Sequence, residues 1–325
     1  MMSADPSTAP TPRHHLRDLL AAYLDELQSL NHSPTTLRSI RYNNQSFLGW
    51  LEETCRVRHV DQLRGRHLPV WLKYLSTYRT SRGRALKPRS VNKRIETVRG
   101  FLRYLAREGY VHRALTDRLV YVKEPSILPT SVLTHAQVKS LLDVVDTSQA
   151  QGYCDRTMLE LLYSSGIRVA ELLGLNLDGL DLPNATALVM GKGRKQRVVP
   201  MGRTALRFLE NYLGGIRPHL QVNPEERALF LDASGQRYPY HTLRRRLHVY
   251  AAKAGIDIQV TPHTFRRSCT TEMLRGGANM YHVKEMLGHE SLDTLKHYAR
   301  LTITDLKKTH RKCHPREKDR NVLDL

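Results

Sequence analysis

The C-terminal half of the chain contains basic residues of types that suit the cleavage of a phosphodiester, together with one candidate nucleophile. Cleavage requires positive charge at the non-bridging oxygens, a proton for the departing oxygen, and a nucleophile in line with it. Arginine presents a planar, permanently charged fork to phosphate oxygens, whereas lysine, histidine and tyrosine can exchange protons. The candidate residues, in chain order, are Arg168, Lys192, His263, Arg266, His289 and Tyr298. Such a set could cut and rejoin DNA without a metal ion.

Each of these residues lies in a short sequence motif. The motifs are YSSGIRVAEL around Arg168, GKGRKQRVVP around Lys192, PHTFRR with His263 and Arg266, LGHE with His289, and KHYARL with Tyr298. With these motifs in this order, roughly residues 15–300 resemble the tyrosine recombinase (phage integrase) family, and within it the short Xer-like members. The resemblance implies a site-specific DNA recombinase that works through a 3′-phosphotyrosyl intermediate.

Several roles are assigned on this basis. Arg168 and Arg266 would stabilise charge on the non-bridging oxygens in the transition state. The resemblance makes Lys192 the general acid that protonates the 5′ hydroxyl as it leaves, with Lys195 in the same turn as the alternative. Glu171, one helical turn beyond Arg168, is expected to orient that arginine or its helix.

The histidines and the tyrosine complete the expected site. His263 lies one helical turn before Arg266, so both should face the same pocket; it would assist proton removal from the tyrosine or donate a hydrogen bond to the phosphate. His289 would also hydrogen-bond the phosphate. Tyr298 would be the nucleophile, and because a phenol has a pKa of about 10, nearby positive charge is needed to favour the phenolate. Since one phosphoester replaces another, we expect no ATP, metal or other cofactor.

The composition agrees with a DNA partner. The formal net charge is +20 at pH 7 and 40% of the 325 residues are hydrophobic, which suits a globular protein that binds a polyanion. The resemblance implies double-stranded DNA with a specific recombination site, bound by a homo- or hetero-tetramer in a synaptic complex. We found no apolar run of the ~18 residues that a membrane span needs and no hydrophobic signal core, so we expect a cytoplasmic protein. The four scattered cysteines are interpreted as reduced thiols.

The expected fold is mainly α, with a small antiparallel β-sheet in the C-terminal domain, arranged as a two-domain DNA clamp. We expect a disordered tip at residues 1–12, a helical core-binding (SAM-like) domain at 13–120, a linker at 121–134, and a catalytic domain with a C-terminal tail at 135–325. Helices are predicted from Leu16, from Ser33 as N-cap with Pro34 at the first position, and near 61–78 and 90–108. In the catalytic domain an apolar helical stretch runs over 158–173, strands flank the GKGRKQ turn at 185–190 and 198–200, and helices return from about 203 to the end.

A basic surface is expected on the first domain. Residues 56–118 contain 17 Lys and Arg against 4 Asp and Glu, a density typical of a DNA-facing surface. Along the helix near 90–106 apolar residues can pack inward while basic side chains stay largely free to contact phosphates. The expected DNA contacts are Arg89, Lys93, Arg94, Arg99 and Arg103.

Other interpretations remain open. The fold could serve an accessory DNA-binding protein, although the active-site set is complete, or a relaxing topoisomerase of related chemistry. About a dozen residues precede the first helix, too few for the arm-binding domain of larger phage integrases. The 27 residues after Tyr298 are basic, which favours integration, excision or transposition of a mobile element over Xer-type dimer resolution. His310, Cys313 and His314 resemble half of a zinc site, but no second half is evident, so we interpret the tail as a basic terminal helix.

Overall fold

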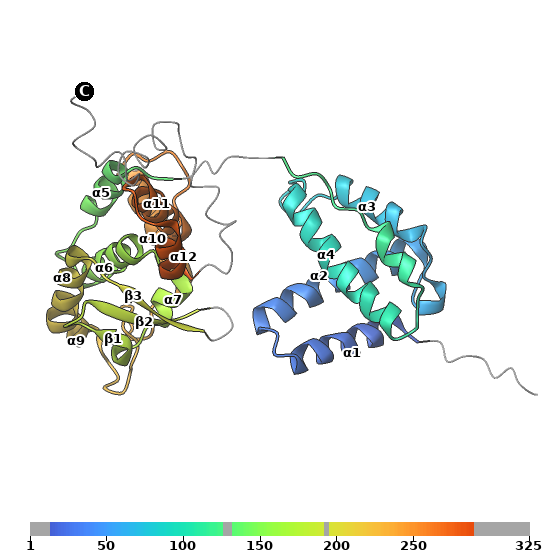
Figure 1. Ribbon diagram of the computed structural model, residues 1–325, viewed down its shortest axis with the longest axis horizontal. Coiled ribbons are helices and arrows are strands. Elements are labelled where there is room, and N and C mark those ends of the chain that lie inside the picture. Colours follow the sequence, from blue (N-terminus) through green and yellow to red (C-terminus); the bar gives the residue numbers. More distant parts are fainter. Residues whose placement is uncertain (1–13, 126–131, 192–194, 289–325) are drawn as a thin grey trace, which may run out of the picture. The chain divides into compact units, whose positions relative to one another are not determined.

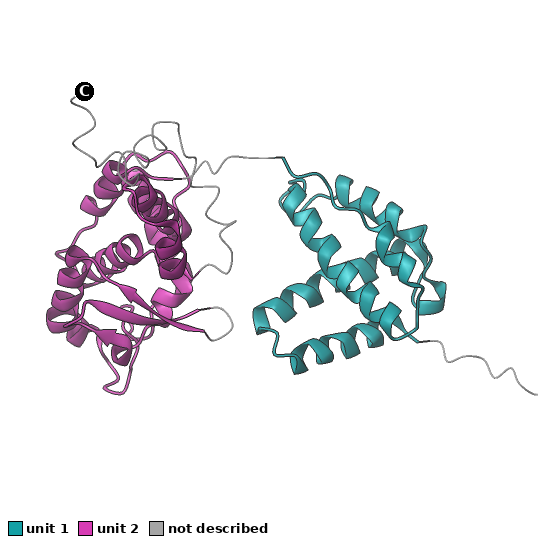
Figure 2. Ribbon diagram, in the orientation of Figure 1, with its two compact units in different colours: residues 1–126 teal, residues 127–325 magenta. Residues whose placement is uncertain are grey.

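The computed structural model describes residues 14–125, 132–191 and 195–288. These residues form a mainly helical structure with one three-stranded antiparallel sheet (Figure 1), which confirms the predicted fold class. The chain divides into two compact units, residues 1–126 and 127–325 (Figure 2). None of the helices in the described ranges is both long and apolar enough to span a membrane. The predicted tip at 1–12 lies outside the described residues.

The first unit is built from helices around an aromatic core. Its elements are α1 (Leu16–Ser29), α2 (Pro34–Cys55), α3 (His67–Thr77) and α4 (Pro88–Arg107), with 3-10 turns at Val60–Gln62 and Arg113–Arg118. Phe47, Trp71 and Phe101 are almost fully buried between these helices. Ser33 caps α2 by accepting a hydrogen bond from the Thr36 amide, and Pro34 occupies the first turn, both as predicted.

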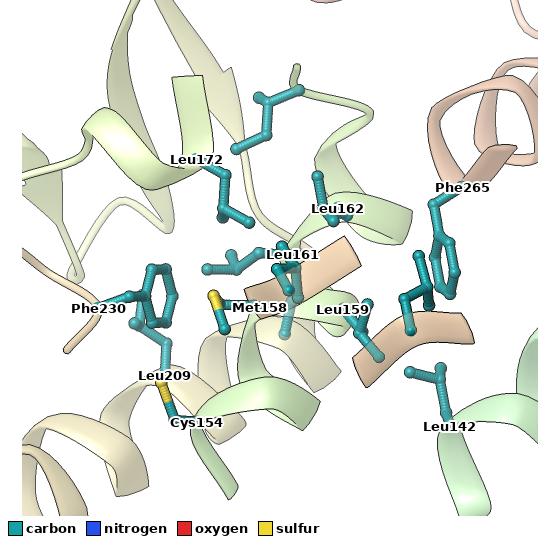
Figure 3. Close-up of a cluster of buried hydrophobic side chains, with 14 of the residues drawn as sticks. Leu142, Cys154, Met158, Leu159, Leu161, Leu162, Leu172, Leu209, Phe230 and Phe265 are labelled. Atoms are coloured by element: carbon teal, nitrogen blue, oxygen red, sulfur yellow. The ribbon is translucent and has the colours of Figure 1, made fainter. Parts of the chain in front are cut away.

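The second unit contains the sheet and the remaining helices. Its elements are α5 (His135–Asp143), α6 (Ala150–Ser165), α7 (Val169–Gly174), β1 (Leu180–Asp181), β2 (Thr186–Met190), β3 (Gln196–Pro200), α8 (Arg203–Asn211), a π turn (Tyr212–Ile216), α9 (Arg217–Leu220), α10 (Tyr240–Lys253), α11 (Pro262–Arg275) and α12 (Met280–Leu287). The core lies around α6: Figure 3 shows Met158 and Leu161 in the middle of the cluster, with Phe230 on one side and Phe265 on the other.

The sheet has the order β1–β2–β3, and both pairings are antiparallel. Leu188 of β2 lies opposite Val198 of β3, and both face outward, whereas Val189 and Val199 are buried. Side chains alternate between the two faces of a strand, so Arg197 shares the inner face with Val199. The Gly191 amide donates to the Lys195 carbonyl at 2.8 Å, which closes the base of the hairpin.

Two segments differ from the sequence-based prediction. The apolar stretch at 158–173 forms two helices, because α6 ends at Gly166 in a left-handed conformation with φ +61°. A Cβ at Gly166 would lie 2.7 Å from Leu287 Cδ2, so the chain turns there against α12. The helices after 203 are also interrupted between α9 and α10. Here the buried Arg217 guanidinium donates to the carbonyls of Glu226 and Ala228. These hydrogen bonds give the carbonyls of a non-helical segment the partners that a helix would otherwise supply.

We expect the turn at Gly166 to tolerate no side chain. In Gly166→Ala the alanine must adopt a left-handed backbone conformation, and its Cβ also collides with Leu287. Gly255 has a similar φ of +65°, but a Cβ there would meet no atom within 4 Å. Gly166→Ala should therefore lose about 1–3 kcal/mol more of unfolding free energy than the control Gly255→Ala, which bears the backbone cost alone. Thermal unfolding midpoints of the two variants measure this. Equal losses would show that the contact with α12 accommodates a methyl group.

Candidate active site

A buried carboxylate lies at the centre of the candidate site. Glu171 of α7 has a side chain that is 3% exposed, and both of its oxygens accept hydrogen bonds from arginines. Arg197 of β3 donates through both terminal nitrogens, at 2.8 Å to each oxygen. Arg168 donates its Nη1 to Oε1 at 2.8 Å and its backbone amide to Oε2 at 2.7 Å. Glu171 thus connects the start of α7 to the third strand.

The charge of Glu171 is stabilised by these partners. Burial alone raises the pKa of a carboxyl group, but the hydrogen bonds from Arg197 and Arg168 outweigh burial and lower the pKa of Glu171 to about 2. The carboxylate is therefore ionised at neutral pH. It neutralises part of the positive charge that two adjacent guanidinium groups would otherwise bring together.

Three arginines bind the last three carbonyls at the end of α12. Arg197 Nε donates to Met286 O at 3.0 Å, Arg266 Nη2 to Leu287 O at 2.7 Å, and Arg168 Nη2 to Gly288 O at 2.9 Å. The carbonyls at the C-terminus of a helix lack intrahelical partners and carry the negative end of the helix dipole. Guanidinium groups from α7, β3 and α11 therefore fix the backbone position from which the chain continues to residue 289.

His263 lies beside this cluster, at the start of α11. The helix begins with a capping box between Thr261 and Thr264, and Pro262 occupies its first turn. Partial burial and then the charges of Arg266, Arg267 and Arg168 lower the pKa of His263 below its usual value of 6.5. The side chain is still exposed. At neutral pH it is an uncharged imidazole, which can accept a proton.

The described structure brings together part of the predicted site. Arg168, His263 and Arg266 meet with Glu171, which has the supporting position expected of it. The sequence placed both arginines on the phosphate, but they differ in exposure: the Arg168 side chain is 38% exposed and Arg266 is 3% exposed. Arg266 also donates to Gly166 O at 2.7 Å, so much of its hydrogen bonding serves the fold.

The remaining predicted residues cannot be placed in the same way. Lys192, His289 and Tyr298 lie outside the described residues, as do the tail residues His310 and Cys313. Lys195 is exposed at the base of the hairpin. Arg197 was not predicted. Its only sequence signal is a charged residue at an inward position of a strand, two residues before the buried Val199.

The basic face of α4 also differs from expectation at one position. Arg89, Lys93 and Arg103 are exposed, and Lys93 pairs with Glu96 at 3.0 Å. Arg99 is partly buried, with its guanidinium 5.2 Å from the Tyr121 ring centroid.

Arg94 is 8% exposed, and its guanidinium lies 4.9 Å from the Tyr78 ring centroid. The prediction that the Arg94 side chain is largely free to contact phosphate is therefore wrong. Position 94 falls on the same side of α4 as Val91 and Val98, so the arginine stem packs inward and the charge rests against an aromatic ring.

Two models of known protein families match this chain. The model of the phage integrase family matches residues 131–304, and the model of the N-terminal SAM-like domain of phage integrases matches residues 20–109. One matched segment lies in each of the two compact units.

Curated relatives match over nearly the full length. The tyrosine recombinase XerD of Staphylococcus epidermidis is 32% identical over 302 residues, which cover 93% of this chain and 100% of the relative. XerD of Pseudomonas putida is 37% identical over 287 residues, which cover 87% of this chain and 92% of the relative.

Solved structures share the fold at lower identity. The XerH site-specific recombinase bound to difH substrate aligns with a TM-score of 0.67 and 17% identity, covering 93% of this chain and 90% of that one. A lambda integrase dimer bound to a COC′ core site aligns with a TM-score of 0.68 and 15% identity, covering 89% and 79%. On the matches of both family models and of the XerD relatives, this chain belongs to the phage integrase family of tyrosine recombinases.

Proposed function

We propose that this protein is a site-specific DNA recombinase that cuts and rejoins DNA strands through a covalent bond between Tyr298 and a 3′ phosphate. The observation that carries the proposal is the convergence of Arg168, His263 and Arg266 at the end of α12. Two of these groups can stabilise anionic charge and the third can accept a proton. Membership of the phage integrase family supports the same chemistry.

In the proposed reaction the phenol of Tyr298 attacks the scissile phosphorus while the 5′ oxygen leaves. His263 takes up the phenolic proton. Its lowered pKa keeps the imidazole uncharged at neutral pH, so a nitrogen is available to accept that proton. Arg168 and Arg266 stabilise the non-bridging oxygens, and His289 donates a hydrogen bond to one of them. Lys192 protonates the leaving oxygen. A phosphoester is formed for each one broken, so the bond energy is retained for rejoining.

The proposed partner is double-stranded DNA with a specific recombination site, bound by four protomers that are identical or of two kinds. The exposed basic residues of α4, namely Arg89, Lys93 and Arg103, are the proposed phosphate contacts of the first unit, with Arg99 at their side. Because the substrate is DNA, the proposal places the protein in the cytoplasm. Both an element-borne recombinase and an Xer-type resolvase would use the same site.

The covalent step is tested with a nicked suicide substrate that carries the protein's own site. Wild-type protein should form an adduct that survives denaturation, and Tyr298→Phe should abolish it while DNA binding is retained, because only the hydroxyl is lost. Electrophoresis under denaturing conditions detects the adduct. An adduct of unchanged yield in Tyr298→Phe would assign the nucleophile to another residue.

The acid is tested with a 5′-bridging phosphorothiolate at the scissile position. A thiolate leaves without protonation, so this substrate should restore most of the rate that Lys192→Ala loses on the ordinary phosphodiester, a loss of roughly 10²- to 10⁴-fold. Arg168→Ala should gain nothing from the sulfur, since it lacks charge stabilisation instead. Rescue of Lys195→Ala in place of Lys192→Ala would move the role to the other lysine.

The DNA-binding face of α4 is tested by salt dependence. Replacing Arg89, Lys93 and Arg103 with Gln should weaken DNA binding and reduce the slope of log K against log salt by about 0.9 for each lost phosphate contact. A matched control is the triple replacement of Arg38, Arg41 and Arg58, which are also basic residues of the first unit. If both triple variants have the same slope as the wild type, α4 does not face DNA.

A further inference from the structure

The side chain of Arg197, a residue of the sheet, makes three hydrogen bonds within the described residues, and all three reach segments of the candidate site. Its side chain is 15% exposed. Two terminal nitrogens bind the two oxygens of Glu171, and Nε binds the Met286 carbonyl. A single guanidinium group therefore joins β3, α7 and α12, three segments that are distant in the sequence.

The slot that holds this guanidinium is built by two glycines. A Cβ at Gly288 would lie 3.1 Å from three atoms of the Arg197 guanidinium, and a Cβ at Gly191 would lie 3.4 Å from its Nη1. Gly288 also has φ +63°, a conformation that favours glycine. The backbone on both sides thus leaves room for a planar group, and the acceptors around it match a fork of N–H donors.

We propose that Arg197 is a positioning residue for the recombination site, acting through Glu171 on Arg168 and through Met286 on the end of α12. This inference rests on the proposed function and adds a residue to it. Glu171 Oε1 accepts from both Arg168 and Arg197, so the direction of that carboxylate depends on both. Without the Arg197 fork, Glu171 can rotate, and the exposed Arg168 guanidinium loses the acceptor that fixes its orientation.

Each guanidinium nitrogen of Arg197 already donates to Glu171 or Met286, which favours a role in holding other groups over a role as a phosphate ligand. Its N–H groups that point to Glu171 and Met286 are already used, whereas Arg168 retains an exposed side chain. Arg197 therefore acts on the reaction by holding other groups. Displacing a catalytic group by about 1 Å can slow a reaction about 10²-fold. This sets the expected size of the effect on the cleavage rate.

Arg246 of α10 offers a matched control in the same unit. It binds a fully buried carboxylate, Asp155 of α6, and also the Tyr250 hydroxyl. Neither of these two partners, both within the described residues, belongs to the candidate site. Arg246→Lys therefore removes a comparable guanidinium–carboxylate interaction from the fold without touching Glu171 or α12.

The first measurement compares backbone hydrogen exchange in Arg197→Lys and Arg246→Lys. Lysine keeps the charge but lacks the planar fork of N–H donors that reaches both oxygens of Glu171 and the Met286 carbonyl at once. In Arg197→Lys, exchange should accelerate in peptides covering residues 166–174 and 280–288, and Arg246→Lys should leave both peptides as in the wild type. Unchanged exchange in Arg197→Lys would overturn the proposal, whatever the activity of the protein.

The second measurement compares cleavage of an ordinary phosphodiester with cleavage of a methylphosphonate, which lacks one anionic oxygen. Arg197→Lys should form covalent adduct 10- to 100-fold more slowly per folded molecule on the phosphodiester. The deficit should shrink on the methylphosphonate, because a misplaced Arg168 matters less when there is less charge to stabilise. Equal deficits on the two substrates, or none, would contradict positioning of Arg168.

The two measurements separate the inference from the proposed function. Failure of the wild type to form any adduct with its site would count against recombination, while the exchange comparison still decides whether Arg197 holds Arg168 and α12. Arg197→Gln serves as a second variant if Arg197→Lys does not fold. If neither variant folds and Arg246→Lys does, Arg197 is required for the fold and the proposal of a positioning role is wrong.

Discussion

The carboxylate of Glu171, shared between the guanidinium groups of Arg168 and Arg197, is the interaction on which the candidate site depends. Burying one carboxylate at 3% exposure is costly, and holding two guanidinium groups beside each other is costly as well. Placing the anion between the two cations offsets both costs, and hydrogen bonds occupy each oxygen twice. The same arrangement leaves Arg168 directed outward with its orientation fixed before any phosphate arrives.

The end of α12 extends this arrangement to the rest of the second unit. Its last carbonyls accept hydrogen bonds from β3, α11 and α7, so the strand that leads from the hairpin and the two helices that carry the basic residues share one anchor. Gly166 and Gly288 make the close approach possible, because each adopts a left-handed conformation where a side chain would collide. The site is thus assembled by backbone carbonyls as much as by side chains.

Local signals in the sequence predicted a substantial part of this structure. Ser33 with Pro34 marked a helix start, since capping depends on neighbouring residues only. Motifs identified Arg168, His263 and Arg266, which the structure brings together. Recognition of the motifs came from resemblance, whereas their meeting at α12 is a property of the fold.

Three features of the structure were not predicted, and only one of them depends on contacts distant in the sequence. The break at Gly166 is a left-handed helix end, for which the glycine itself was a local signal that apolar periodicity alone does not include. Arg94 was expected to be free because it is charged, yet its position on α4 turns it towards Tyr78. Arg197 gains its importance only from partners in two other segments. For Arg197 the deciding neighbours lie elsewhere in the chain, whereas the inward spacing of Arg94 with Val91 and Val98 is present in the sequence.

The most direct test of this account is the pH dependence of the stability that Glu171 contributes. Its pKa is lowered to about 2 from a usual value of 4.5, so the contribution is complete above about pH 4.5 and is lost as the pH falls towards 2, a change of about 3 kcal/mol. The difference in thermal midpoint between wild type and Glu171→Gln should therefore be large at neutral pH and should narrow steadily below about pH 4.5. A difference that stays constant over this range would show that the ionised carboxylate does not hold the site together.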